Sequence, residues 1–247
     1  MITLKTPREI EQMREAGQIV GMVHRELAKA IAPGVTTGEL DALAEKLIRQ
    51  AGGVPTFKGY NGYPASICAS VNEVVVHGIP GRQALKEGDI IAIDLGVTYH
   101  GWVGDSAFTY PVGRIDAVAQ RLLDVTRVAL EKAIEQCYPG NRLGDVGSAV
   151  QRHVETNGFS VVRDYVGHGV GRSMHEDPQV PNWGQPGTGK VLRPGMVIAI
   201  EPMVNEGTWD VQVLADQWTV VTADRKRSAH FEHTVAITEE GPTILTR

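Results

Sequence analysis

The sequence predicts an α+β fold in which two similarly built halves, each a helix pair followed by antiparallel strands, surround a common site. The Pro-Gly pair at residues 33–34 recurs at 139–140, and each pair separates a long helical segment from a short one. Residues 85–94 (LKEGDIIAID) also align with residues 192–201 (LRPGMVIAIE). In both copies a basic turn with glycine leads into four apolar residues and then a carboxylate. We therefore expect one domain over residues 1–247, with an internal repeat of about 1–113 and 114–247.

The helices are predicted from apolar residues at helical spacing and from residues that typically begin or end a helix. The first helix follows Thr6-Pro7 and runs to about Ala32, and Thr37 caps a second helix over about 38–50. In the second half, a long helix covers about 116–136 and a shorter one about 143–156. Pro-Gly, Gly-Gly or Asn-Gly pairs follow these segments, as expected at helix ends.

Two strands of the first half contain aspartates. Residues 90–97 and 102–110 are predicted strands, and residues 99–101 form the turn between them. If the hairpin folds about the 99/100 junction, Asp94 lies directly opposite Asp105, with Cβ atoms about 4.5–5.5 Å apart. Two carboxylates so close together need a shared proton or a cation. A metal ion is favoured because further candidate ligands remain, and a solvated polar hairpin face is the alternative.

Two glutamates occupy comparable positions in the second half. Glu201 ends the apolar strand of the repeated decapeptide, and alternation in residues 231–237 places Glu232 on the face opposite the large apolar side chains. Either glutamate alone would more often be a surface residue. Together with Asp94 and Asp105, they form a set of four carboxylates that suits hard or borderline divalent ions.

Three of the eight histidines are candidate site residues. His168 stands in the segment GHGVG, where glycines let the backbone approach an ion or a substrate closely. His77 and His175 each begin a His-x-x-Pro pattern, once in each half. The other five are not expected to take part in a site. His233 is expected to point away from Glu232 and to be structural, and surface positions are favoured for His24, His100, His153 and His230.

Composition and absent motifs exclude several classes of function. The 24 basic and 29 acidic residues give a net charge of −5 without a Lys/Arg cluster, which argues against a nucleic-acid-binding face. The two cysteines, Cys68 and Cys137, are expected to be free thiols. With no signal peptide and no apolar span of roughly 18 residues, we expect a soluble, cytoplasmic protein. HExxH and GxSxG motifs are absent, and the glycine-rich segment at 167–171 lacks the lysine and the following helix of a nucleotide site.

The five candidate ligands lie in sequence segments that resemble those of a known enzyme family. In their order along the chain they resemble the metal ligands of the methionine aminopeptidases: Asp94, Asp105, His168, Glu201 and Glu232. The segments GHGVGRSMHEDP (167–178), VNEVVVHGIP (71–80) and DLGVTYHGWVGD (94–105) look like signatures of the type I enzymes, and the resemblance covers essentially the whole chain. It implies the pita-bread fold, whose internal pseudo-symmetry around a central dinuclear metal site agrees with the repeat.

The resemblance also implies an activity, namely metal-dependent removal of the N-terminal methionine from nascent polypeptides with a preference for small second residues. Asp105 and Glu232 would bridge two divalent ions, Asp94 would complete one metal site, and His168 with Glu201 would complete the other. A water shared by the ions would attack the first peptide carbonyl while Glu201 accepts a proton. The ions would be Co²⁺, Mn²⁺, Fe²⁺ or Zn²⁺, because this mixed nitrogen and oxygen donor set accepts them all.

Further roles follow from the same resemblance. His175 would stabilise the tetrahedral oxyanion, and His77 would contact the scissile amide and position the substrate. A pocket for the methionine thioether, which favours contacts with aromatic rings, is implied by four residues: Tyr60, Tyr63, Cys68 and Trp218. Ordinary core packing is the alternative for these four. The chain departs from common family members at Met174, where Phe is frequent, and at Phe57, a variable gate position.

The expected partners are few. The substrate is a peptide or a nascent chain, a transient contact with the ribosome is expected, and the protein is expected to be a monomer that binds neither a specific nucleic acid nor a membrane. Two other functions stay open at this point: an Xaa-Pro peptidase of the same fold, and a non-catalytic binding module that reuses the fold and holds no stoichiometric divalent ion.

Overall fold

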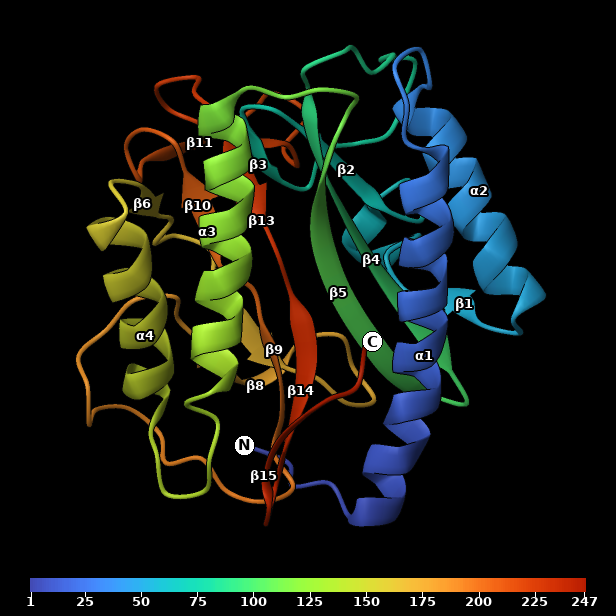
Figure 1. Cartoon of the computed structure of the whole chain (residues 1–247). Helices are drawn as coiled ribbons and strands as arrows, with labels where there is room; N and C mark the ends of the chain where they lie inside the picture. Colours follow the sequence, from blue (N-terminus) through green and yellow to red (C-terminus); the bar gives the residue numbers. More distant parts are fainter.

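The computed structural model describes residues 1–247 (Figure 1). The helices are α1 (Pro7–Ala30), α2 (Thr37–Gln50), α3 (Ala117–Ile134) and α4 (Leu143–Thr156), with a 3-10 turn at Tyr60–Gly62. Strands of the first half are β1 (Val54–Pro55), β2 (Cys68–Val71), β3 (Val74–Val76), β4 (Ile90–Tyr99) and β5 (Trp102–Pro111). Those of the second half are β6 (Ser160–Val161), β7 (Gly167–Gly169), β8 (Glu176–Val180), β9 (Val197–Ile200), β10 (Met203–Asn205), β11 (Val211–Val213), β12 (Val220–Thr222), β13 (Ser228–His230), β14 (His233–Thr238) and β15 (Gly241–Ile244). None of the helices combines the length and apolar character needed to cross a membrane.

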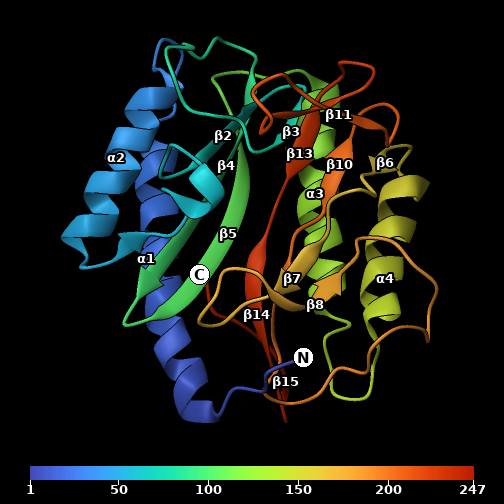
Figure 2. The same ribbon diagram turned by 180° about the vertical axis from the view of Figure 1, so that it is seen from behind.

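Both helix pairs cover the same face of the strands. Helices α1 and α3 lie in front of the strands in Figure 1 and behind them in Figure 2. One core cluster joins α1 and α2 to β4 and includes Ile93 and Leu95, while another joins α3 and α4 to β9 and β14. Because Ile93 and Leu95 pack toward the helices, Asp94 between them faces the other side of the sheet.

The predicted helices are present, with small differences at their ends. Thr6 and Glu9 form a capping box at the start of α1, in which each side chain bonds the other residue's backbone N–H. Thr36 and Glu39 form the same box at the start of α2. The prediction that Thr37 caps this helix is therefore wrong by one residue, because the Thr-x-x-Glu spacing that satisfies both backbone groups begins at Thr36.

The register of the β4–β5 hairpin corrects the predicted pairing of the aspartates. Asp94 lies opposite Ala107, and Asp105 lies opposite Gly96, so the two aspartates are not directly paired. The pairing differs from the predicted one by two residues along one strand. Since side chains alternate with a period of two, this shift leaves Asp94 and Asp105 on the same face of the sheet.

The turn explains the shift. Tyr99 pairs with Trp102, which leaves a loop of only two residues, His100 and Gly101. Their φ angles are 49° and 76°, and a two-residue loop with positive φ at both positions matches the right-handed twist of the flanking strands. The predicted fold point at the 99/100 junction had placed the centre of the turn one residue too early.

The two halves meet where β5 approaches β14. The Thr234 hydroxyl donates to the backbone oxygen of Asp105 at 2.7 Å and accepts from its N–H at 3.1 Å. The N–H of Glu232 donates to the carbonyl of Ala107 at 2.8 Å. We refer to these contacts as the seam. The seam connects two sheets. One has the order β1-β4-β2, with β5 paired to β4, and the other has the order β15-β14-β9-β7-β8.

Matching contacts occur in the two halves at positions equivalent under the predicted repeat. The N–H of Gly34, in the first Pro-Gly pair, donates to the carbonyl of Leu85 at 2.8 Å. The N–H of Gly140, in the second pair, donates to the carbonyl of Leu192 at 3.0 Å. Each contact ties the loop between two helices to the start of the repeated decapeptide. The boundary between the halves at about 113/114 stays a prediction.

Candidate metal centre

Acidic side chains from both halves converge at the seam. Asp94 and Asp105 come from neighbouring strands β4 and β5, Glu201 directly follows β9, and Glu232 directly precedes β14. Glu232 and Asp105 are almost fully buried, with exposed fractions of 2% and 4%. The sheet pairing therefore brings together four carboxylates that are separated by up to 138 residues in the sequence.

His168 lies among these carboxylates. Its Nε2 atom is 3.5 Å from Oε1 of Glu201 and 3.8 Å from Oδ2 of Asp105. Potential ligand atoms of Asp105, His168 and Glu232 all lie within 4.8 Å of one another. The backbone around His168 is closely packed, because a Cβ at Gly167 would lie 2.3 Å from the carbonyl oxygen of Ala199. Only glycine permits this approach of β7 to β9.

Several buried oxygen atoms at the centre have no hydrogen-bond partner: Asp94 Oδ1, Asp105 Oδ1 and Glu232 Oε1. Unpaired buried carboxylates are costly, and they either take up a proton or bind a cation. Burial raises the pKa of Asp105 to about 7. Burial, reinforced by repulsion from neighbouring carboxylates, raises the pKa of Asp94, Glu201 and Glu232 well above the usual range. Oxygen atoms without partners beside an imidazole nitrogen fit a divalent metal ion.

The protonation of His168 also suits a metal ligand. Its Nδ1 atom is 3.0 Å from the carbonyl oxygen of Gly169, so Nδ1–H donates this bond and Nε2 keeps its lone pair. Burial lowers the pKa of His168 to about 4, which keeps the ring neutral at pH 7. The free nitrogen therefore faces the carboxylates of Glu201 and Asp105.

Every site residue predicted from the sequence lines one cavity of about 280 Å³: Tyr60, Tyr63, Cys68, His77, Asp94, Asp105, His168, His175, Glu201, Trp218 and Glu232. Phe57 and Met174, the two departures from the family pattern, line it as well, and so do Asn61, Val76, Tyr165 and Val166. The carboxylates occupy one part of this cavity, and the aromatic residues provide its apolar surface.

His175 and His77 stand at this cavity in different settings. The Nδ1 atom of His175 lies 2.8 Å from the hydroxyl of Tyr60, and its ring centre is 4.3 Å from that of His168. His77 has a φ of 60°, a left-handed backbone that is uncommon for a residue other than glycine. Burial lowers its pKa to about 4, and its ring packs edge-on against Trp218. Backbone strain of this kind concentrates at functional sites.

Hydrogen bonds and ring contacts hold the aromatic part of the cavity. The Tyr63 hydroxyl lies 3.0 Å from the carbonyl oxygens of both Ile67 and Gly78, which share its single proton, and the Tyr63 ring meets Trp218 edge-on at 5.1 Å. Both cysteines are free, as predicted. Burial raises the pKa of the Cys68 thiol, so Cys68 remains protonated and lines the cavity as a small apolar group.

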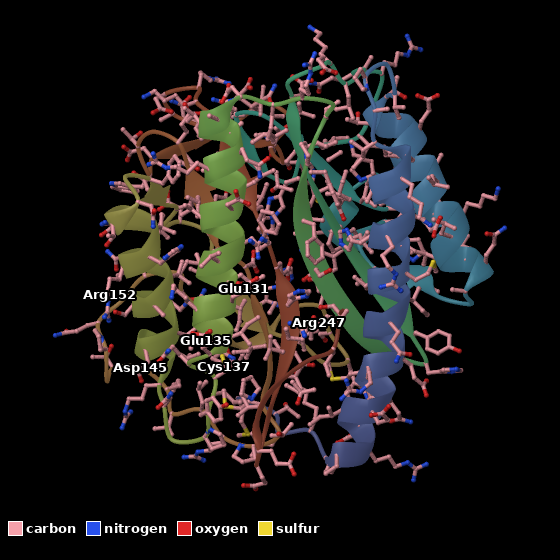
Figure 3. All side chains as sticks on the ribbon, in the orientation of Figure 1. Glu131, Glu135, Cys137, Asp145, Arg152 and Arg247 are labelled. Atoms are coloured by element: carbon pink, nitrogen blue, oxygen red, sulfur yellow. The ribbon has the colours of Figure 1, made fainter.

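Cys137 lies apart from the cavity. It is fully buried in the core of the second half, just beyond the end of α3, where Figure 3 labels it. Its thiol is 3.5 Å from the carbonyl oxygen of Ala133, and burial raises its pKa to about 12. A buried thiol of this kind is a packing residue, not a nucleophile.

Surface positions for two histidines were predicted wrongly, and one of them belongs to the site. His230 has an exposed fraction of 2%, and its Nε2 atom lies 3.7 Å from Oε2 of Glu201 with no hydrogen-bond partner. A signal was available, since His230 precedes Glu232 by two residues and extended residues two apart share a face. His24 is also buried, within α1. By contrast, His233 bonds Thr246 at 2.8 Å, in keeping with the structural role predicted for it.

Comparisons with known proteins agree with this site. Residues 11–239 match the model of metallopeptidase family M24. The chain is 58% identical to methionine aminopeptidase 1 of Bacillus subtilis over the full length of both proteins. It is 44% identical to methionine aminopeptidase of Escherichia coli, covering 99% of this chain and 94% of that protein.

Solved structures give the same result. The crystal structure of methionine aminopeptidase from Thermotoga maritima superposes with a TM-score of 0.98 at 54% identity and full coverage of both chains. The prolidase from Pyrococcus furiosus superposes with a TM-score of 0.78 at 25% identity, and the match covers 99% of this chain but 65% of that one. The predicted pita-bread fold is thereby confirmed. With its fold, its buried cluster of acids and histidine, and relatives that match from end to end, the chain belongs to metallopeptidase family M24.

Proposed function

We propose that this protein is a methionine aminopeptidase, which hydrolyses the first peptide bond of a chain that begins with methionine. The observation that carries the proposal is the meeting of two features in one cavity. A buried centre of four carboxylates and His168 adjoins an apolar surface that includes Tyr63 and Trp218. The full-length likeness to methionine aminopeptidases supports it. Nascent chains are the proposed substrates in the cell, and contact with the ribosome stays a prediction.

Two divalent ions are proposed for the centre. Asp105 and Glu232 would each hold both ions, Asp94 would hold the first, and His168 with Glu201 the second. Divalent ions bound there supply Lewis-acid chemistry and lower the pKa of water toward neutrality. The unpartnered oxygens of Asp94, Asp105 and Glu232 support this arrangement. Co²⁺, Mn²⁺, Fe²⁺ and Zn²⁺ all suit the donor set.

The side chains around the centre have separate roles in the proposed reaction. Glu201 accepts a proton from the attacking water. His175 donates a hydrogen bond to the carbonyl oxygen as negative charge develops on it. The 2.8 Å contact with Tyr60 supports this role, because a phenol that donates to Nδ1 leaves the proton of a neutral His175 on Nε2. His77 contacts the scissile amide and orients the substrate.

The apolar surface gives the proposed specificity. A long, unbranched thioether packs well against aromatic rings, and Tyr60, Tyr63 and Trp218 supply such rings beside Cys68. The cavity of about 280 Å³ is slightly smaller than the usual ligand site of about 300–1,000 Å³. Small second residues are therefore preferred, since a large one would compete for the same limited space.

Peptide hydrolysis by metal-stripped protein tests the proposal. Each divalent ion is added back singly, and release of the N-terminal residue is measured from Met-Ala-Ser, from Met-Leu-Ser and from an Xaa-Pro peptide. We expect metal-restored release from Met-Ala-Ser, slower release from Met-Leu-Ser and none from the Xaa-Pro peptide. Equal rates for the two methionine peptides would contradict the size preference.

Other outcomes of this experiment would overturn the proposal itself. Release from the Xaa-Pro peptide alone would identify a proline-specific peptidase of the same fold. No turnover with any ion, together with no stoichiometric metal bound, would identify a binding module instead.

A further inference from the structure

Lys5 is a buried lysine outside the catalytic cavity. Its side chain is only 3% exposed, and lysine is almost never buried unless it is paired. The Nζ atom donates to Oε2 of Glu176 at 2.7 Å and to the carbonyl oxygen of Thr3 at 3.3 Å. The partner residue Glu176 lies 171 positions further along the chain, directly after His175. This ion pair therefore joins the start of the chain to the segment that carries a proposed catalytic side chain.

Glu176 also closes the turn that contains His175. Its Oε1 atom accepts from the N–H of Arg172 at 2.9 Å and from the N–H of Ser173 at 3.3 Å. The fit is tight, because a Cβ at Gly171 would lie 2.3 Å from this same oxygen. One carboxylate thus bonds Lys5 with one oxygen and the turn at 172–176 with the other.

The segment that carries Lys5 is itself fixed to the second half. Residues 1–6 lead from the N-terminus to α1. The N-terminus lies near β15, which belongs to the second half, whereas α1 belongs to the first half (Figure 1). The N–H of Lys5 donates to the carbonyl of Gly195 at 2.7 Å. A Cβ at Gly195 would lie 2.8 Å from the Lys5 carbonyl oxygen, which shows how closely the two segments pack. Lys5 is therefore anchored at its backbone before its side chain reaches Glu176.

We propose that the partly buried Lys5–Glu176 ion pair positions His175 for the reaction, so that Lys5 and Glu176 are positioning residues of this enzyme. This inference rests on the proposed function. The Glu176 carboxylate is only partly buried, and when it loses its cationic partner it turns toward water. That movement alters the bonds from Glu176 to Arg172 and Ser173, and with them the orientation of the turn. His175 then meets the substrate carbonyl in the wrong geometry.

The first test compares Lys5→Met with Asp177→Asn. Asp177 follows Glu176 and pairs with the amino group of Met1, but this pair is exposed, so its loss should have little effect. We expect Lys5→Met to lower kcat on Met-Ala-Ser by about 10- to 100-fold with KM nearly unchanged, as for a misplaced catalytic group. Asp177→Asn should keep the wild-type kcat. Equal effects of the two substitutions, or none from Lys5→Met, would overturn the proposal.

A double-mutant comparison separates positioning from general damage. In a His175→Ala background, Lys5→Met should cause little further loss of kcat, because the side chain that it misplaces is already absent. Full additivity of the two losses would show that Lys5 acts elsewhere.

Calorimetric titration of metal-free protein with Mn²⁺ should give similar affinities for the wild type and Lys5→Met. A parallel loss of metal affinity would also contradict a role limited to His175.

Two further measurements apply if Lys5→Met does not fold or if the wild type shows no activity. Lys5→Met/Glu176→Gln removes both charges, so it leaves no unpaired buried ion and should fold even if the single variant does not. Its kcat should remain reduced, and a wild-type value would overturn the proposal.

The ¹⁵N shifts of the His175 ring in metal-free protein report its contact with Tyr60 without any turnover. Lys5→Met should change them and Asp177→Asn should not; if the wild type releases no methionine, the proposed function fails while this result still judges the positioning.

Discussion

His24 shows how a single buried side chain couples stability to pH. Its Nε2–H donates to the carbonyl oxygen of Ser106 at 3.0 Å, and its Nδ1 accepts from the Tyr110 hydroxyl at 3.0 Å. Both ring nitrogens are satisfied only while the ring is neutral. Burial accordingly lowers the pKa of His24 from 6.5 to about 4.

We predict that this histidine destabilises the protein in acid. The unfolded chain protonates His24 near pH 6.5, whereas the folded chain protonates it only near pH 4. The contribution of the neutral His24 to the free energy of unfolding is therefore fully present above pH 6.5 and is lost as the pH falls from 6.5 to 4. The full difference is ~3 kcal/mol. Urea unfolding of the wild type and His24→Gln at pH 7.5 and pH 5 measures it, and the variant should lose less stability between the two. Equal losses would mean that His24 titrates normally.

The site residues differ in how far the sequence could predict them. The carboxylates, His168, His77 and His175 stand in distinctive local patterns, and all of them line the cavity. His230 offers only its spacing of two residues from Glu232, and its burial depends on sheets formed by residues distant in the sequence. The second role of Tyr60, its bond to His175, depends on a contact between residues 115 positions apart. Local chemistry was readable from the sequence, whereas these long-range contacts were not.

At the level of elements, close backbone packing sets the position of α1 against β5. A Cβ at Gly104 in β5 would lie 2.7 Å from the backbone nitrogen of Gly17 in α1. A Cβ at Gly17 would lie 2.2 Å from the carbonyl oxygen of Leu245. The helix is thus held between β5 and the last residues of the chain, with no room for a methyl group on either side.

We predict that Gly104→Ala destabilises the protein by about 1–3 kcal/mol or more, because backbone atoms must move apart to admit the methyl group. Gly81→Ala is the matched control. Gly81 has no left-handed φ and nothing within 4 Å of an added Cβ, so the change should be neutral or stabilising by about 0.4–1 kcal/mol. Chemical denaturation of the metal-free proteins measures both. A neutral Gly104→Ala would show that α1 can shift freely.

The hairpin illustrates what sequence patterns can and cannot determine about an element. Alternation and apolar content identified β4 and β5 and the face of each aspartate, but the exact pairing depended on the loop between them. A two-residue loop at His100 and Gly101 requires positive φ at both positions, and a histidine is a weaker signal for this than asparagine. The Pro-Gly pairs and the helical spacing of apolar residues, which are local signals, predicted the helices more closely, although the cap of α2 was placed one residue late at Thr37.

For the whole molecule, the convergence of acids at the seam predicts a large effect of metal on stability. An ion that binds only the folded state at 100 times its Kd adds about 2.7 kcal/mol to the free energy of unfolding. Thermal unfolding with EDTA and then with excess Mn²⁺ should therefore show a clear rise in Tm. Glu232→Gln should raise the Tm of the metal-free protein, because it removes a carboxyl group whose pKa is raised by burial and by its acidic neighbours, and should reduce the response to Mn²⁺. An unchanged response would exclude Glu232 as a ligand.

The seam has a consequence for the synthesis of the protein itself. Asp94 and Asp105 are synthesised well before Glu232 and the strand that follows it. The hydrogen bonds of the seam cannot form before Glu232 and Thr234 have been made, so a chain translated only as far as Glu201 lacks part of the proposed ligand set. Such a chain is therefore expected to lack hydrolytic activity, which begins only after β14 has been synthesised and joined to β5.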